Sequence, residues 1–258
     1  MNRSVRNALA AFAIAGAVVI SGATVVAAAG PAISGGPAGT GPCATQAAAV
    51  KAGATVDNLR AFGDCEIARR MTTLDKLASR ISSSKVLTSS DSAALSGEVS
   101  STRSGLTSLK SSIDAETSIA ALKADVKKIA ADYRVYLLVV PQVNLVNASD
   151  AVQATKTAFD KVNTNLSARI AAAKAAGKDT TVAQQNLDAM NAAVSQALSL
   201  TAPLPAALLP LTPAQWNSGS AAPVIKDARA KLVQARDLIK TARKDAQACR
   251  DALRSLKK

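Results

Sequence analysis

The last part of the chain carries the pattern that most restricts its fold. From Pro223 onward, small or aliphatic side chains recur at gaps of three and four residues. Such gaps draw one continuous seam along a helix, as in coiled coils, and here the seam lasts more than four heptads. Its members are Ile225, Ala228, Leu232, Ala235, Ile239, Ala242, Ala246, Cys249, Leu253 and Leu256. We therefore expect a long helix packed closely on a partner helix, from this chain or from another copy.

Five earlier segments show the same helical spacing of apolar residues. They are expected at about 55–83, 90–113, 119–140, 148–176 and 181–197. Pro141 is expected to stop the third of these, because proline cannot continue a helix. Asn147 and Asp150 look like the cap and first-turn acid of the fourth, and Gly177 like the residue that ends it.

The segment 202–221 differs from its neighbours. Four prolines forbid a long helix there, yet its leucines and Trp216 are too apolar for a solvated linker. Thr212 to Gln215 reads as a capping box with proline at the first helical position. We expect a Pro/Leu-rich crossover that lies across the other helices and is anchored by Trp216.

Together these elements predict an all-α protein. Short connections between long helices favour an elongated, up-and-down antiparallel bundle of about six helices with coiled-coil-like seams. The bundle domain is expected to span residues 55–258. With six helices alternating in direction, the first helix would begin at the same end at which the last one closes.

The N-terminus has the plan of an export signal. Arg3 and Arg6 precede an uncharged apolar run that ends in Ala27-Ala28-Ala29, a pattern typical of a signal peptide over residues 1–29. An uncleaved membrane anchor is the alternative, since the run is long enough to span a bilayer. Residues 30–54, rich in Gly, Pro and Ala at their start, are expected to form a flexible leader.

Three cysteines follow the predicted signal: Cys43, Cys65 and Cys249. An oxidising compartment favours one disulfide and leaves one thiol over, with three pairings open. Cys65 and Cys249 are the favoured pair, because in a six-helix bundle they stand at matching heights near the same end. None of the spacings suits a metal site.

The amino-acid composition excludes several kinds of catalytic and metal-binding site. The chain has no histidine and only 2% aromatic residues, so Ser-His-Asp, Cys-His and histidine-ligated metal centres are excluded. Glutamates stand alone on separate segments, and phosphate-binding glycine loops are missing. Tyr133 and Tyr136 read as core residues whose hydroxyls reach the bundle edge. We therefore expect no catalytic residues, no cofactor and no enzyme activity.

Positive charge is concentrated near the C-terminus. The chain has 31 basic and 18 acidic residues, and the surplus falls largely on the last helix. Candidate polyanion-binding residues there are Arg229, Lys231, Arg236, Lys240, Arg243, Lys244, Arg250 and Arg254. Anionic envelope polymers or lipid headgroups would suit them, whereas the lack of stacking aromatics argues against nucleic acid. A plain solvated face, with interleaved aspartates supporting the helix, is the competing interpretation.

Two short sequence segments resemble segments of known proteins. DYRVYLLVVPQ at 132–142 and LTPAQWN at 211–217, followed by an Arg/Ala/Asp-rich last helix, resemble secreted, uncharacterised all-helical proteins of high-GC actinobacteria. The resemblance implies export and an all-helical body, and it implies no catalytic residues.

The sequence thus predicts a secreted or envelope-associated protein with a structural or protein-interaction role. Its partner would be itself or another helical protein. Polyanion binding through the last helix is the alternative function. Contact with a membrane is expected only if the N-terminal segment is retained.

Overall fold

All regular structure in the described part of the chain is helical. The computed structural model describes residues 41–256, which contain nine α-helices, one π-helical turn and no strand. The elements are α1 (Ala44–Ala52), α2 (Val56–Ser83), α3 (Ser89–Ala115), α4 (Ile119–Ala131), η1 (Val135–Val139), α5 (Val140–Ala175), α6 (Thr181–Thr201), α7 (Leu204–Leu208), α8 (Pro213–Asn217) and α9 (Ala221–Ser255). The predicted all-α class is confirmed. All six expected long helices are present, and α1 is an additional one.

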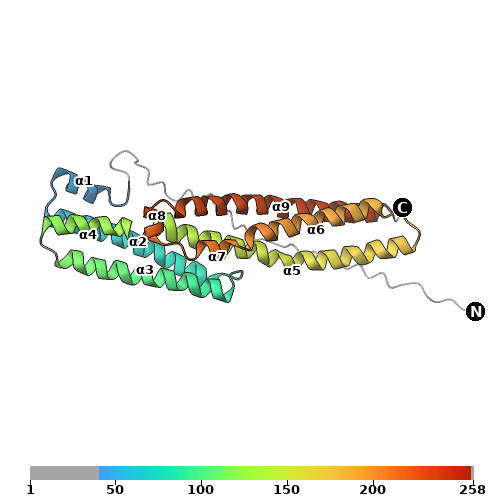
Figure 1. Ribbon diagram of the computed structural model, residues 1–258, viewed down its shortest axis with the longest axis horizontal. Helices are drawn as coiled ribbons and strands as arrows, with labels where there is room; N and C mark the ends of the chain where they lie inside the picture. Colours follow the sequence, from blue (N-terminus) through green and yellow to red (C-terminus); the bar gives the residue numbers. More distant parts are fainter. Residues whose placement is uncertain (1–40, 257–258) are drawn as a thin grey trace, which may run out of the picture.

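Helices α2, α3 and α4 pack together at one end of the molecule (Figure 1). Large aliphatic side chains at helical spacing fill the space between them. The buried members include Leu59, Ile67, Leu74, Ile81, Leu95, Val99, Leu106, Ile113, Leu122 and Ile129. Each such side chain contributes about 1.5–3 kcal/mol when it leaves water, so this face of each helix decides how the three helices meet.

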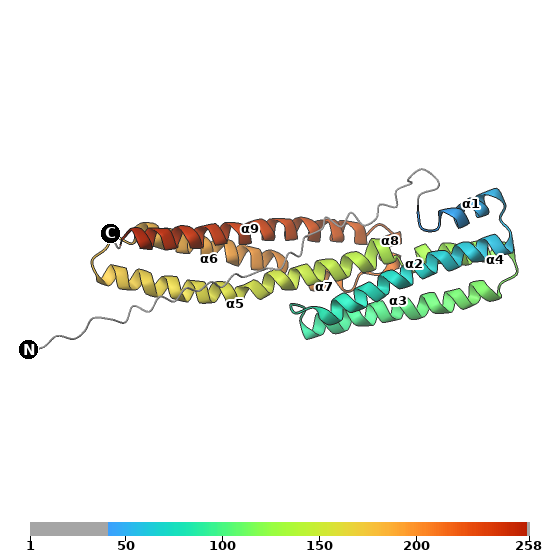
Figure 2. The same ribbon diagram turned by 180° about the vertical axis from the view of Figure 1, so that it is seen from behind.

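Helices α5, α6 and α9 form a second group toward the other end, as both views show (Figures 1 and 2). Here α6 runs antiparallel to α9, and their pairing is the most extensive helix contact in the described chain. Nine of the ten expected seam positions of α9 are buried, while Leu256 is half-buried. Ala235 and Ala242 contribute small side chains to the core that α9 shares with α6.

The two groups have separate hydrophobic cores that share two helices. The beginnings of α5 and α9 are buried with α2, α3 and α4, while their later turns are buried with α6. The start of α2 and the end of α9 therefore lie at opposite ends of an elongated molecule (Figure 1). The prediction that they meet at one end was wrong, because the fourth long helix runs away from the first three instead of folding back along them.

The break after α4 does not fall at Pro141. The helix ends at Ala131, and Arg134 adopts a left-handed conformation with φ of 43°. A π-helical turn over Val135–Val139 follows, and Pro141 lies in the first turn of α5. Proline is tolerated there because its ring would clash only with the carbonyl of a regular preceding turn, which the wider π-turn replaces.

Asn147 and Asp150 also serve a different helix from the one expected. Both lie inside α5, where Asn147 Oδ1 accepts a hydrogen bond from the Ser84 hydroxyl at 2.7 Å. Asp150 Oδ2 accepts one from the Thr88 amide at 3.0 Å. The two side chains thus hold the loop that leads into α3, so their capping chemistry acts across the fold rather than within their own helix.

The crossover buries its leucines as expected. Leu204, Leu208 and Leu211 are buried against the first core, and the predicted capping box between Thr212 and Gln215 is present. The fully buried Gln142 of α5 donates from its amide to the carbonyls of Leu208 and Leu211, at 2.9 and 3.0 Å. These bonds join α5 to the last residue of α7 and to the link between α7 and α8.

Part of the expected flexible leader is helical. Within residues 30–54, α1 covers Ala44–Ala52, and the Asn58 amide closes its end by donating to the carbonyl of Gly53 at 2.8 Å. Alanine, which has the highest helix propensity, supplies five of its nine residues. The signal peptide predicted over 1–29 and the start of the leader lie outside the described residues.

Candidate functional site

Four arginines stand seven residues apart along α9. Arg229, Arg236, Arg243 and Arg250 each follow directly after a small seam residue, and we call them the arginine row. Seven residues advance about 10.5 Å along a helix, so the row is about 32 Å long. The first three arginines are exposed and Arg250 is half-buried.

The arginine row forms no ion pair within the described chain. The ion pairs on α9 join Lys231 to Asp227 at 2.8 Å and Arg254 to Asp251 at 3.4 Å. Arg250 instead donates from Nε to Oε1 of Gln247 at 3.1 Å. The row therefore has no neutralising carboxylate within the described chain.

The other basic residues of α9 divide into two kinds. Lys231 and Arg254 are the paired ones just described. Lys226, Lys240 and Lys244 are exposed and form no ion pair in the described part of the chain. Lys226 and Lys240 lie beside the arginine row on the same flank of the helix, while Lys244 points outward from the seam.

The C-terminal end of the arginine row lies near α5. Arg169 of α5 and Arg250 both lie close enough to Cys249 for their charges to lower the pKa of its thiol, although burial raises that pKa more strongly. Neither arginine forms an ion pair in the described residues. Sequence reasoning missed Arg169, because its position depends on α5 and α9 lying side by side.

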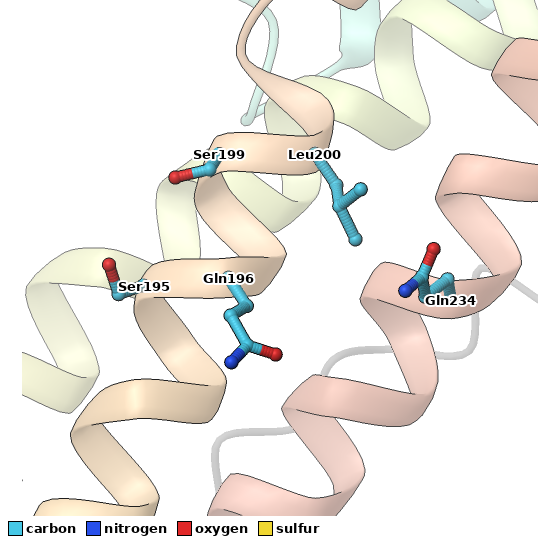
Figure 3. A pocket seen from close by; sticks show the side chains of 5 residues that line it. All are labelled: Ser195, Gln196, Ser199, Leu200 and Gln234. Carbon is cyan, nitrogen blue, oxygen red and sulfur yellow. The ribbon is translucent and has the colours of Figure 1, made fainter.

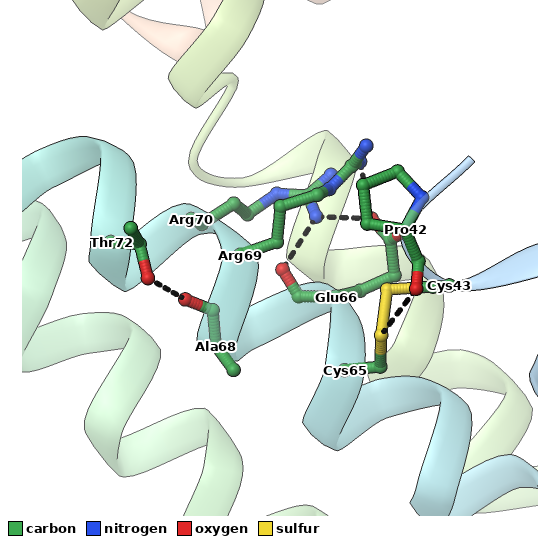
Figure 4. Close-up of a disulfide and its surroundings, with 8 residues drawn as sticks. All are labelled: Pro42, Cys43, Cys65, Glu66, Ala68, Arg69, Arg70 and Thr72. Carbon is green, nitrogen blue, oxygen red and sulfur yellow. Dashed lines mark hydrogen bonds and ion pairs between the residues drawn. A yellow bond between two sulfur atoms is a disulfide. The ribbon is translucent and has the colours of Figure 1, made fainter.

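Cys65 is bonded to Cys43 and not to Cys249 (Figure 4). The predicted pairing of Cys65 with Cys249 was wrong, because those two residues lie in different groups of helices. Cys249 is fully buried in the second core as a free thiol. The bond instead fastens the residue before α1 onto α2.

A charged cluster borders this disulfide (Figure 4). Glu66 forms ion pairs with Arg69 at 2.8 Å and with Arg70. Both guanidinium carbons lie over the Tyr136 ring, at 4.9 and 5.3 Å from its centroid. The Tyr136 hydroxyl is buried and lacks a hydrogen-bond partner, so it does not reach the edge as expected. The charged groups of the cluster interact with one another, and the cluster ties α2 to the π-turn.

Two open grooves lie on the surface of the described chain. One, of about 330 Å³, lies between α6 and α9 and is lined by Ser195, Gln196, Ser199, Leu200 and Gln234 (Figure 3). Gln234 stands on the flank of α9 opposite the arginine row. The other, of about 420 Å³, lies at the tip of the hairpin of α5 and α6, near Lys174 and Asp179. Amides and hydroxyls line the first groove, without a titratable group.

Metal ligands do not gather in the described residues. Within 41–256, histidine, cysteine and carboxylate side chains form no group of three that could hold an ion.

One run of helix is long and apolar enough, by length and composition, to cross a membrane. It covers Ile119–Ala175, and half of its most apolar window is buried inside the structure. The run includes the break at Arg134, and its most apolar residues, such as Leu138, Val139 and Val146, belong to the first core. Core helices meet the same criterion, so the run is explained by its packing.

Comparison of the chain with protein-family models, with curated proteins and with solved structures finds no match. The features above are therefore interpreted from their own chemistry.

Proposed function

We propose that this protein is exported and acts without catalysis, in a structural or protein-interaction role at the cell envelope or in the surrounding medium. The observation that carries the proposal is the arginine row, a line of charge about 32 Å long that the described chain leaves without an ion pair. An exposed line of this length on a rod-shaped protein suits a partner that lies alongside it. The open grooves suit surface contact better than enclosed chemistry.

Two further features support export. The N-terminal sequence has the plan of a signal peptide, and the disulfide between Cys43 and Cys65 fits an oxidising compartment. The resemblance to secreted actinobacterial helical proteins points the same way. Coiled-coil-like packing between α6 and α9 is part of the proposal, because small seam residues favour close antiparallel helices.

Fractionation of the native host tests this proposal. We expect the protein in the medium or the envelope fraction, with its N-terminus at Gly30 by mass spectrometry, Cys43 bonded to Cys65, and Cys249 reduced. Crosslinking of that fraction through lysines should join α9 to a second protein. Recovery from the cytosol with Met1 intact, or an absence of crosslinks to α9, would overturn it.

Polyanion binding is the second candidate function. It is favoured by the balance of charge on α9, where nine basic residues face four aspartates. Contacts with anionic polymer release counterions, so the affinity for long-chain polyphosphate should fall steeply between about 50 and 200 mM salt, as expected for several neutralised charges. Affinity that does not change with salt would rule this candidate out.

A further inference from the structure

The spacing of the arginine row indicates what kind of partner could use it. A second α-helix lying alongside α9 presents its own side chains at the same interval of seven residues, about 10.5 Å. Four carboxylates at that spacing would each meet one arginine. A flexible polyanion gains nothing from a regular interval, because its charges adjust to any arrangement of basic residues.

The unpaired positive charges of the arginine row favour binding of an anion from outside the described chain. Arg169 and Arg250 lie near the same thiol and form no ion pair in the described chain. A carboxylate placed beside an unpaired guanidinium is stabilised by its charge. Arginine is also the side chain that binds carboxylates in a two-bonded geometry.

An apolar contact is available on the same flank. Val233 lies between Arg229 and Arg236 and is 53% exposed, which makes it one of three large aliphatic residues left exposed in the described chain. An apolar side chain of a docked helix could cover it. An aliphatic contact flanked by charged residues is typical of helix pairs in which the flanking charges determine the specificity of pairing.

A second copy of this chain does not supply the required pattern. The described helices carry at most two carboxylates in succession at a spacing of seven residues, as in Asp57 and Asp64 of α2 or Asp91 and Glu98 of α3. Two carboxylates cannot match four arginines. The partner must therefore come from a different protein.

We propose that the arginine row binds an amphipathic helix of another protein whose carboxylates recur every seventh residue. This inference rests on the proposed interaction role and names its partner by chemistry. Lys226 and Lys240 add positive charge on the same flank of α9.

Two synthetic peptides test the proposal on the protein containing residues 30–258. Both are alanine-based helices with four glutamates, placed at every seventh residue in one and clustered in the other, and their equal helicity is checked by circular dichroism. At about 0.15 M salt, where exposed charges are screened beyond about 8 Å, we expect fluorescence anisotropy to show roughly tenfold tighter binding of the regularly spaced peptide. Equal binding of both peptides, or binding of neither, would overturn the inference.

A charge-matched pair of variants locates the site. Replacing the arginine row by glutamine (R229Q, R236Q, R243Q and R250Q together) should abolish the preference for the regular peptide. Replacing four exposed lysines of the first group (K76Q, K85Q, K123Q and K127Q) should keep it, although the net charge changes equally. Equal loss in both variants would mean that only overall charge matters and would overturn the inference. Circular dichroism confirms that both variants are folded.

Sedimentation and crosslinking separate the remaining outcomes. If wild-type protein forms a dimer that the arginine-row variant loses, a second copy occupies the row and the inference is wrong. If native crosslinks join α9 to a second protein while the peptide preference is missing, the proposed function stands and the inference alone fails.

Discussion

At the scale of single residues, Gly105 has the closest neighbour of any glycine in the described chain. A Cβ atom built on Gly105 would lie 2.5 Å from Cε1 of Tyr133 and 2.9 Å from its hydroxyl. Tyr133 thus lies against the bare backbone of α3 just after α4 ends. Glycine weakens an isolated helix. At position 105 its missing side chain leaves room for the Tyr133 ring, which packs against the first core.

Gly105→Ala should therefore destabilise the protein, by about 1–3 kcal/mol, because the ring must be displaced. Gly97 lies on the same helix, and a methyl group added to it would meet nothing within 4 Å, so Gly97→Ala should stabilise by about 0.5–1 kcal/mol. Urea denaturation of both variants measures the difference. Equal stabilities would show that Tyr133 moves aside freely.

The buried carboxylate of Asp150 makes the stability of the fold depend on pH. Burial raises the pKa of Asp150 above its ordinary value of 3.8, the Thr88 amide acts in the opposite direction, and the nearby carboxylate of Asp91 raises it further. Because the folded protein binds this proton more tightly than the unfolded chain, the contribution of Asp150 to stability rises as pH falls through the raised pKa toward 3.8. At neutral pH the cost of keeping the buried charge is present in full.

Asp150→Asn should thus be more stable than wild type at neutral pH, since the neutral amide can accept from Thr88 and donate to Asp91. Its advantage should shrink as pH is lowered toward about 4, where carboxylates take up protons. Chemical denaturation at a series of pH values between these limits follows the difference in unfolding free energy. Asp57→Asn is the control, because Asp57 is exposed in the first turn of α2, where a negative charge is favourable, and it has no contact with Asp150. An Asp150→Asn variant less stable than wild type at neutral pH would contradict the assignment.

At the scale of elements, α1 depends on its attachments. It has nine residues and none of them is buried, while Cys43 just before it is 4% exposed. Helices this short are marginal alone in water. Its order therefore comes from the disulfide to Cys65, from the Asn58 amide at its other end, and from the partly buried Val50, which packs against the first core.

Reduction of the disulfide should release α1 and leave the rest folded. Amide hydrogen exchange in residues 44–52 should accelerate strongly with reductant, and the Cys43→Ser variant should behave alike. In the chain-entropy model a loop of this size contributes about 3 kcal/mol, which is the upper limit for the loss of global stability. Cys249→Ser is the matched control, because that thiol lies in the other core; unchanged exchange in α1 after reduction would refute its dependence on the bond.

Helical faces could be predicted from the sequence, whereas breaks could not. Spacing alone identified nearly the whole buried face of α9, because a helix shows its periodicity locally. Pro141 was expected to end a helix, but the π-turn before it accommodates the ring. Asn147 and Asp150 look like caps to a reader of sequence, yet their partners lie more than 60 residues away in the loop before α3.

At the scale of the whole molecule, the arrangement of the helices could not be predicted from the sequence. Short connections show that successive helices are antiparallel, but they do not show how many helices share one core. The wrong pairing of Cys65 with Cys249 followed from assuming a single bundle. The arginine row could be recognised from its spacing of seven residues, whereas the nearness of Arg169 required the packed helices.

The two-core arrangement predicts an extended shape in solution. Helices α3 and α9 are about 40 and 52 Å long, and they overlap where the first turns of α9 enter the first core, so together they give a rod with a radius of gyration of about 25 Å. A compact domain of the described length would have about 17 Å. Small-angle X-ray scattering of the protein from residue 41 onward distinguishes these values, and a result near the compact value would mean that the two groups fold back on each other.

Helices α5 and α9 pass from one core into the other without a loop between them. Bending the rod at its middle would therefore break backbone hydrogen bonds in two helices at once and shear both cores. The protein should behave mechanically as a stiff strut, which holds whatever is attached near α1 at a fixed distance from whatever is attached near the end of α9.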